Sequence, residues 1–157
     1  MIKYFIILLF VFSCDDDSGG GFNSPDDTEE NINLPIHWDN DLNGVLDNYN
    51  DFENSGSITC IVNNEEGYMV GEGDMLSAYI NGEQRGVAIA SETPEQLTDY
   101  TYQFLLLVYG DVSNVPINFK YYKHAEDVIF DILNSREYVV NMTEGIVTNP
   151  IILEIDE

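Results

Sequence analysis

A run of oxygen-bearing side chains near the start of the chain has the spacing of a calcium-binding loop. Residues 39–50 read Asp-Asn-Asp-Leu-Asn-Gly-Val-Leu-Asp-Asn-Tyr-Asn. Ca²⁺ takes roughly six to eight oxygen ligands, which alternate residues of such a loop supply on one side of a turn, and a glycine permits the sharp bend. The pattern predicts a calcium site with these ligands: Asp39, Asp41, Asn43, the carbonyl of Val45, and Asp47.

The twelfth position of this loop departs from the usual pattern. Asn50 stands where a bidentate carboxylate normally completes the calcium shell, and Asp51 and Glu53 are the nearby candidates to replace it. The alternative is an acidic stretch in which Asn and Gly only form turns. That alternative stays open, because the chain carries 29 acidic residues against five basic ones, and Asp-x-Asp arises readily by chance at such a composition.

The remaining reactive side chains do not form a recognisable catalytic set. His37 and His124 are far apart and lack the flanking residues of a zinc site. Cys60 lies in the alternating stretch Ser57–Val62, which predicts a buried thiol that acts as a small hydrophobe. No nucleophile lies beside a base, so we expect a protein that is not an enzyme.

Tyrosine is abundant, with ten residues in the chain. Tyr79, Tyr109 and Tyr122 fall on strand faces opposite to the inward sets or at a strand end, where they are candidates for exposed stacking platforms for a sugar or peptide. The favoured interpretation is that tyrosines cover the sheet faces because their rings fit a half-buried pleat.

Short runs of alternating apolar residues begin at Gly56 and must supply the framework for any site. The expected inward sets are Ile58/Cys60/Val62, Leu76/Ala78/Ile80, Ile117/Phe119/Tyr121, Val128/Phe130/Ile132, Tyr138/Val140/Met142 and Ile151/Leu153/Ile155. Asn81-Gly82 predicts a hairpin, Tyr100–Tyr109 a central strand buried on both faces, and Thr93–Leu97 a single helical turn. These patterns predict an all-β chain with a single antiparallel, Ig-like β-sandwich of about seven or eight strands over residues 56–157.

The first fourteen residues have the layout of a bacterial lipoprotein signal. Lys3 precedes an apolar run that is too short to span a bilayer, and Ser13-Cys14 follows it. We expect residues 1–13 to be a signal peptide and Cys14 to be lipidated with palmitate-type chains that anchor the protein in the outer membrane. Residues 14–35 then form an acidic flexible tether, disordered in isolation, and residues 36–55 an acidic lead-in to the domain.

The formal net charge of −24 limits the classes of partner. Such a field repels phosphate backbones, so nucleic acid is not expected as a partner, whereas divalent cations and cationic groups are attracted. The expected contacts are the bilayer through Cys14 and either a glycan or another protein.

Two parts of this sequence resemble known bacterial surface proteins. The carboxylates Asp15–Asp17 after Cys14 are similar to the acidic export signal of Bacteroidetes lipoproteins, which implies an outer-membrane protein facing the cell exterior. Residues 73–87 (GDMLSAYINGEQRGV), 104–110 (FLLLVYG), 117–122 (INFKYY) and 145–153 (GIVTNPIIL) resemble a β-sandwich module that recurs in secreted and surface proteins of the same phylum. Gln84 departs from it at a position where cysteine is common. The resemblance implies fold and compartment, but no chemistry.

Together these features predict a non-enzymatic cell-surface lipoprotein that displays a β-sandwich for binding or assembly. The alternatives are a structural accessory subunit of an envelope, glycan-uptake or secretion complex and, third, an enzyme.

Overall fold

Two β-sheets make up most of the chain that the structure describes. The computed structural model describes residues 38–94 and 97–156. A short 3₁₀ helix, η1 (Tyr49–Asp51), precedes the strands. The strands are β1 (Ser55–Asn64), β2 (Gly67–Tyr68), β3 (Met75–Ile80), β4 (Glu83–Ile89), β5 (Ser91–Glu92), β6 (Tyr102–Tyr109), β7 (Val115–Lys123), β8 (Val128–Asp131), β9 (Arg136–Tyr138), β10 (Thr143–Glu144) and β11 (Ile151–Glu154).

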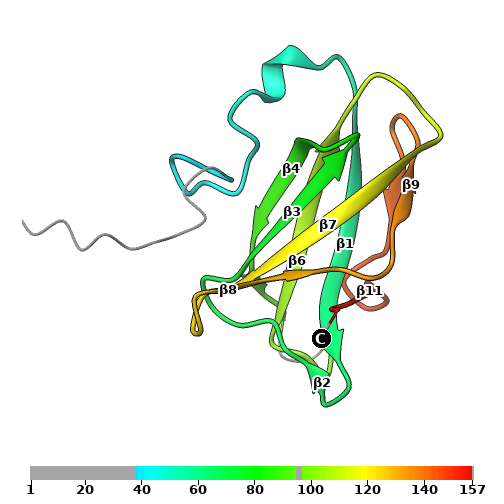
Figure 1. Ribbon diagram of the computed structural model, residues 1–157. Coiled ribbons are helices and arrows are strands. Elements are labelled where there is room, and N and C mark those ends of the chain that lie inside the picture. The colour runs from blue at the N-terminus through cyan, green and yellow to red at the C-terminus, as the bar shows by residue number, and fades with distance from the viewer. Residues whose placement is uncertain (1–37, 95–96, 157) are drawn as a thin grey trace, which may run out of the picture. The chain divides into compact units, whose positions relative to one another are not determined.

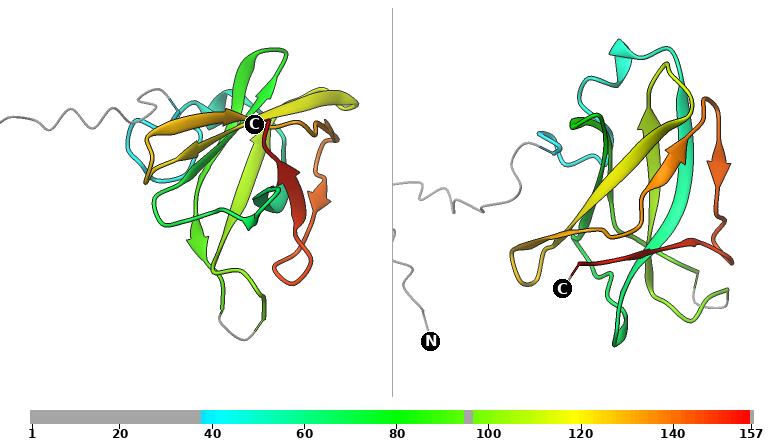
Figure 2. Two further views of the ribbon diagram at one scale, coloured as in Figure 1. Left: turned by 60° about the horizontal axis from the view of Figure 1, so that its bottom comes forward. Right: turned by 45° about the vertical axis from the view of Figure 1, so that its right-hand side comes forward.

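The first sheet has the order β10–β1–β6–β5, and β11 and β2 also pair with β1. The second sheet has the order β4–β3–β7–β8, with β9 paired to β7. Figures 1 and 2 show the two sheets as separate layers, with β3 and β7 on one side and β1 and β6 on the other. The predicted all-β chain is confirmed, and two largely antiparallel sheets are consistent with the predicted sandwich.

The exception to antiparallel pairing lies at one edge of the first sheet. β10 and β11 both run parallel to β1, with Ser57 opposite Thr143 and Cys60 opposite Ile151. Parallel neighbours need a crossover connection between them. Here the chain leaves the first sheet after β6, passes through β7, β8 and β9 of the second sheet, and returns to the first sheet at β10, so that these three strands form part of the crossover.

The core lies between the sheets and follows the predicted alternation closely. The inward sets of β1, β3, β7 and β11 are confirmed, since their side chains belong to one buried cluster that also contains Phe104, Leu106, Val108 and Tyr138. Cys60 is fully buried within it, as predicted, and burial raises the pKa of its thiol well above the usual value. That thiol is therefore held protonated, and its role is packing.

The predicted Asn81-Gly82 hairpin is confirmed. Both residues adopt positive φ angles, 53° and 81°, as the tight turn between β3 and β4 requires. The register shifts after Ala78, which pairs with Gly86, whereas Tyr79 pairs with Gln84. Arg85 is thus the extra residue of a β-bulge, and such bulges redirect a side chain.

Three predictions about individual segments are wrong. β6 is not buried on both faces, because Leu105 and Leu107 point away from the core and are 56% and 44% exposed. Val128 is 40% exposed, since β8 lies at the edge of its sheet. Thr93, Pro94 and Leu97 are not helical, and residues 95–96 between them lie outside the described residues. A continuous run of apolar residues in a sequence does not by itself show whether a strand is covered on both of its faces or on one.

The lead-in that follows residue 37 covers part of the outer face of the second sheet. Trp38 packs with Met75, Val87 and Tyr122, which point away from the main core. The side-chain amide of Gln84 donates a hydrogen bond of 2.7 Å to the Trp38 carbonyl. These contacts attach the segment carrying the predicted calcium loop to β3 and β4.

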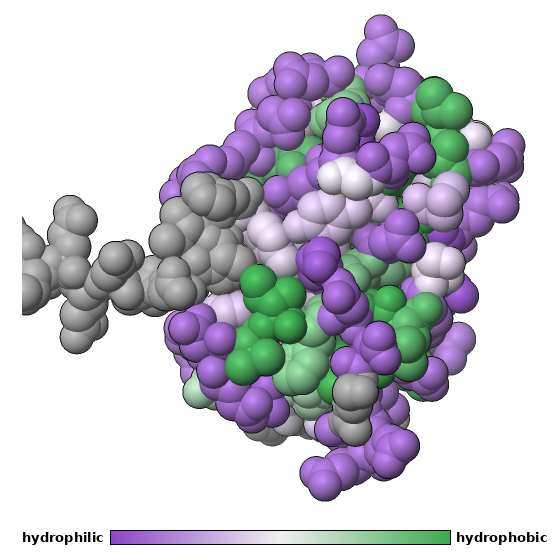
Figure 3. Space-filling model, in the orientation of Figure 1, coloured by the Kyte–Doolittle hydropathy of each residue, from purple (hydrophilic) through white to green (hydrophobic). Residues whose placement is uncertain are grey.

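The signal peptide, Cys14, the tether of residues 14–35 and His37 lie outside the described residues. Within the described chain, none of the helical segments has the length and apolar character needed to cross a bilayer. Hydrophilic residues cover most of the face shown in Figure 3, with apolar groups lying between them.

Candidate functional site

Three carboxylates of the predicted calcium loop meet in space. One oxygen from each of Asp39, Asp41 and Asp47 lies within 4.8 Å of the others. Asp39 is buried, with 4% of its surface exposed, whereas Asp41 and Asp47 are exposed. The carboxylates therefore form a small cup with one buried and two accessible members. Such a cup could bind a metal ion.

The loop backbone is shaped to bring these side chains together. Leu42 and Gly44 adopt positive φ angles of 54° and 75°. The Asn43 Oδ1 accepts a hydrogen bond of 2.7 Å from the Val45 amide, and its Nδ2 donates to Asp41 at 2.8 Å. Asn side chains favour such local turns because they bond to the backbone two residues on. The Asn and Gly residues thus build the bend that the sequence pattern predicts.

The buried carboxylate is incompletely satisfied. Its Oδ2 accepts a short hydrogen bond of 2.6 Å from the Gly44 amide. Its Oδ1 is buried and has no hydrogen-bond partner. A buried charge without a partner is costly unless a counter-ion or a proton neutralises it. Oxygen-only donors around an unpartnered carboxylate oxygen fit a hard divalent cation, and do not fit zinc or copper, which prefer nitrogen and sulfur.

The repulsion between the carboxylates of the cup also favours a bound cation. Hydrogen bonding to the Asp39 carboxylate raises the pKa of Asp41 above its usual value, and desolvation and the negative charges of Asp39 and Asp47 raise it further. These carboxylates repel one another, so that one of them holds a proton more tightly. A cation placed between them would remove the repulsion.

The predicted calcium ligands are three carboxylates and two other oxygen donors. The structure brings together the three carboxylates, while Asn43 and Val45 as ligands remain predictions. Asn50 lies in η1. Neither Asp51 nor Glu53 belongs to the cluster: the amide of Asn48 bonds to Asp51, and the Glu53 backbone donates to Asp111 at 3.0 Å. Neither residue therefore supplies the missing twelfth-position carboxylate.

A hollow of about 570 Å³ adjoins the loop. Trp38, Leu46, Phe52 and Arg85 contribute to its lining, together with Asp47. The Arg85 guanidinium lies 4.4 Å from the centre of the Phe52 ring and pairs with Glu83 at 2.5 Å. Arg85 is thus held in a structural pair at the end of the sheet, and it draws η1 and the loop toward β4.

The three tyrosines considered as exposed platforms do not form a common surface. Tyr122 is buried, with its hydroxyl bonded to Asp127 at 3.0 Å. Tyr109 is half-buried and contacts the rings of Tyr49 and Phe52, and Tyr79 is half-buried on β3.

His124 donates its backbone N–H to Asp74 at 2.8 Å and lies outside the carboxylate cluster.

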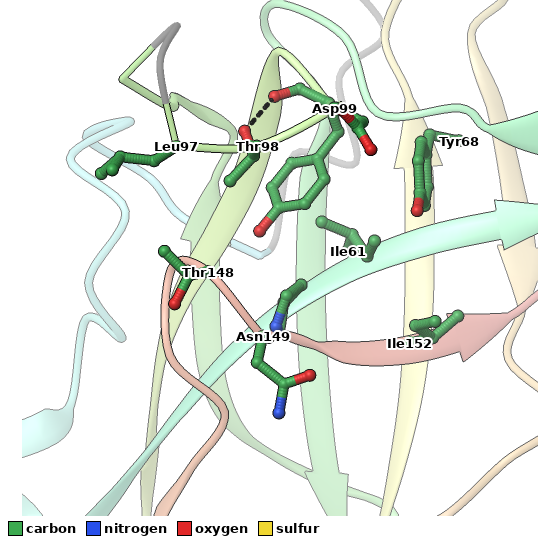
Figure 4. A pocket seen from close by; sticks show the side chains of 10 residues that line it. Ile61, Tyr68, Leu97, Thr98, Asp99, Thr148, Asn149 and Ile152 are labelled. Atoms are coloured by element: carbon green, nitrogen blue, oxygen red, sulfur yellow. Dashed lines mark hydrogen bonds between the residues drawn. The ribbon is translucent and has the colours of Figure 1, made fainter.

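A second hollow, of about 480 Å³, opens on the outer face of the first sheet. The pocket is surrounded by Ile61 of β1, Tyr68 of β2, residues 97–100 before β6, residues 148–150 before β11, and Ile152 of β11. Figure 4 shows Tyr68 and Asp99 toward one side of this hollow and Thr148 toward the other, with Ile61 between them. We call it the outer-sheet pocket. Sequence patterns did not reveal it, because four separate segments build it.

Compared with protein-family models, curated proteins and solved structures, the chain matches none.

Proposed function

We propose that this protein is a non-enzymatic lipoprotein of the outer membrane, facing the cell exterior, which displays a β-sandwich for binding or assembly. The observation that carries the proposal is the order of its parts. A segment with the layout of a lipidation signal, which ends at Cys14, and an acidic stretch precede a domain whose outer sheet face is hollowed by a 480 Å³ pocket. The burial of the Cys60 thiol, which keeps it protonated, supports a role without nucleophilic chemistry.

The second candidate is a structural accessory subunit of an envelope complex. The outer face of the first sheet favours it, because Leu105, Leu107 and Ile152 are between 44% and 56% exposed there. Apolar side chains gathered on one exposed face are typical of surfaces that contact another protein. This candidate has the same anchor and fold as the first. It differs in that the outer face of the first sheet would contact another subunit of a complex.

The strand order supports an Ig-like arrangement of the sandwich. The order β4–β3–β7–β8 follows strands C′–C–F–G of an immunoglobulin variable-type sheet, and β1–β6–β5 follows strands B–E–D. β10 and β11 lie on the edge beside β1, the place of strand A in immunoglobulin domains. In this assignment β2 and β9 extend their neighbours, and β10 and β11 together take the place of one edge strand, which leaves eight principal strands among the described residues.

The cation of the carboxylate cup is proposed to be calcium. Asp39, Asp41 and Asp47 would hold it, with Asn43 and the Val45 carbonyl completing the protein ligands. Its role would be structural, since the cup lies next to Trp38, which attaches the lead-in to β3 and β4. Without a twelfth-position carboxylate we expect a weak, extracellular-type affinity, on the order of 10⁻⁴ to 10⁻³ M.

The anchor is tested at Cys14. The Cys14→Ala variant should not incorporate labelled palmitate and should leave the detergent-soluble membrane fraction, because the acyl chains are its only proposed attachment. Cys60→Ala is the matched control and should be labelled like the wild type, since Cys60 is buried in the core. A Cys14→Ala protein that still incorporates palmitate would disprove the lipoprotein assignment.

The calcium site is tested by thermal unfolding of the full chain, followed through its single tryptophan, which lies next to Asp39. At about 10 mM calcium, an affinity near 10⁻³ M would stabilise the fold by about 1.4 kcal/mol relative to EDTA, a shift of several degrees. The double variant Asp39→Asn/Asp41→Asn should lose this gain, because it removes two of the three carboxylates.

The control must separate chelation from screening of the negative charge. Asp51→Asn/Glu53→Gln removes the same charge outside the cup and should keep the full calcium gain. Ionic strength is matched in every sample. A gain that survives in the Asp39/Asp41 variant, or that magnesium reproduces in full, would mean diffuse counter-ion relief and no specific site.

A further inference from the structure

We propose that the outer-sheet pocket binds a neutral glycan, with a sugar ring lying against Tyr68. This inference rests on the proposed role as a binding module and names its ligand and site. The pocket volume of about 480 Å³ lies within the range of small-ligand sites. Ile61, which points away from the main core on β1, closes the pocket from below and is only 1% exposed, so the surface that a ligand would meet is mainly polar.

Two tyrosine rings form one wall of the pocket. Tyr68 and Tyr100 meet edge to face with ring centres 5.5 Å apart. Tyr100 is fixed, because its hydroxyl donates a hydrogen bond to the Val147 carbonyl, whereas Tyr68 is 53% exposed. Tyr68 thus packs against the fixed ring of Tyr100 and leaves part of its own ring open to solvent, and an aromatic ring suits the C–H face of a pyranose, which is also apolar.

The polar groups of the pocket suit hydroxyl ligands. Asp99, Thr148 and Asn149 are exposed at its rim. A carboxylate only accepts hydrogen bonds, while a hydroxyl and an amide both donate and accept. A sugar hydroxyl likewise donates and accepts, so that adjacent hydroxyls can be matched by this mixed set.

The framework of the pocket is held before any ligand arrives. The Thr98 hydroxyl bonds to the Tyr100 carbonyl at 2.7 Å and lies 3.1 Å from the Thr93 hydroxyl. On the other side, Ile146 and Asn149 exchange two backbone hydrogen bonds of 2.9 and 3.1 Å. Ordering a binding loop in advance lowers the entropic cost of association.

Charge narrows the class of ligand to neutral sugars. Among the described residues that line the pocket there is no lysine, arginine or histidine, and the chain has a formal net charge of −24, so an anionic ligand would be repelled. A cationic peptide is less well matched than a sugar, because Asp99 is the one carboxylate among these described lining residues and their other polar groups are neutral.

The test uses the full chain in a detergent without sugar head groups. Isothermal titration calorimetry is carried out with neutral β-1,4-linked oligosaccharides of glucose, mannose and xylose, with an oligogalacturonate and with an arginine tripeptide. We expect at least one neutral oligosaccharide to bind and the anionic one not to bind. Tyr68→Ala should weaken that binding about tenfold and Asp99→Ala about fivefold.

The matched control is Tyr79→Ala, which removes a half-buried tyrosine from the other sheet and should bind like the wild type. Binding should also persist in EDTA, because the pocket contains none of the cup carboxylates. Failure of every neutral oligosaccharide to bind, equal binding by Tyr68→Ala, or Tyr68-dependent binding of the arginine tripeptide alone would overturn the proposal. Palmitate labelling of Cys14 is independent of these results, so loss of sugar binding with an intact anchor refutes the glycan and leaves the surface lipoprotein standing.

Discussion

At the residue scale, the buried carboxylate of Asp74 is the centre of a hydrogen-bond network. This carboxylate is 2% exposed and accepts hydrogen bonds from the Gly71 amide at 2.7 Å, from the His124 amide at 2.8 Å and from the Tyr121 hydroxyl. It thereby ties the start of β3 to the end of β7. Unlike Asp39, it has donors for both of its oxygens, so this buried carboxylate has a structural explanation that needs no cation.

The same network makes stability sensitive to high pH. Burial, and secondarily the bond to Asp74, raise the pKa of Tyr121 above its ordinary value of 10.0. Burial also raises the pKa of Tyr138. The stabilisation from these two protonated tyrosines is fully present below pH 10. It is lost as the pH rises above 10, because the unfolded chain then releases protons that the folded chain retains. Urea unfolding should therefore show a falling free energy of unfolding above pH 10.

Tyr121→Phe separates the hydroxyl from the ring in this prediction. At neutral pH we expect a loss of about 1–3 kcal/mol, because Asp74 loses a donor. Above pH 10 the free energy of unfolding should fall less steeply with pH in the variant than in the wild type. The two slopes should differ by about 1.4 kcal/mol per pH unit, which corresponds to one proton. Tyr79→Phe, on the outer face of β3, is the control for removal of a hydroxyl. An unchanged slope in Tyr121→Phe would contradict the assigned cause.

At the scale of elements, the two sheets come close together where β4 passes β6. A Cβ atom added at Gly86 would lie 2.3 Å from the Leu107 carbonyl oxygen and 3.2 Å from Leu106 Cδ1. We expect Gly86→Ala to lower the free energy of unfolding by about 1–3 kcal/mol, because backbone atoms cannot move aside cheaply. Urea denaturation measures this loss.

The control for Gly86→Ala is Gly71→Ala. A Cβ atom there would meet only Asp74 Oδ2 at 3.7 Å, an ordinary contact. The change should be neutral or slightly stabilising, since alanine restricts the unfolded chain. Equal stability of the two variants would show that the sheets can separate at Gly86 without cost.

Local sequence patterns predicted those strands that are long enough to show an alternation of apolar and polar residues. The inward faces of β1, β3, β7 and β11 follow from strict alternation, and the carboxylate cup follows from spacing within one loop. β2, β5 and β10 are two residues long, too short for any period to be visible. The parallel pairing of β11 and the outer-sheet pocket join segments far apart in the sequence, and no local pattern encodes such contacts.

At the scale of the molecule, negative charge is hardly compensated. Arg85, Lys120, Lys123 and Arg136 each pair with a carboxylate in the described chain. These are the only cationic side chains after Lys3, against 29 acidic residues. The pairs are largely exposed and contribute little to stability. The excess charge keeps the surface soluble and favours neutral or cationic partners, which is the reason that the calcium and glycan experiments need matched ionic strength.

The place of β11 beside β1 also sets the order in which the fold can be completed. Cys60 pairs with Ile151, so one edge of an early strand stays open until nearly the whole domain has been synthesised. Pairing between such distant segments makes folding slow, and an open strand edge recruits other chains. The nascent chain is therefore most exposed to aggregation before its last strand is available. Docking of β11 ends this period, and any factor that protects the incomplete chain would have to cover the edge of β1 until then.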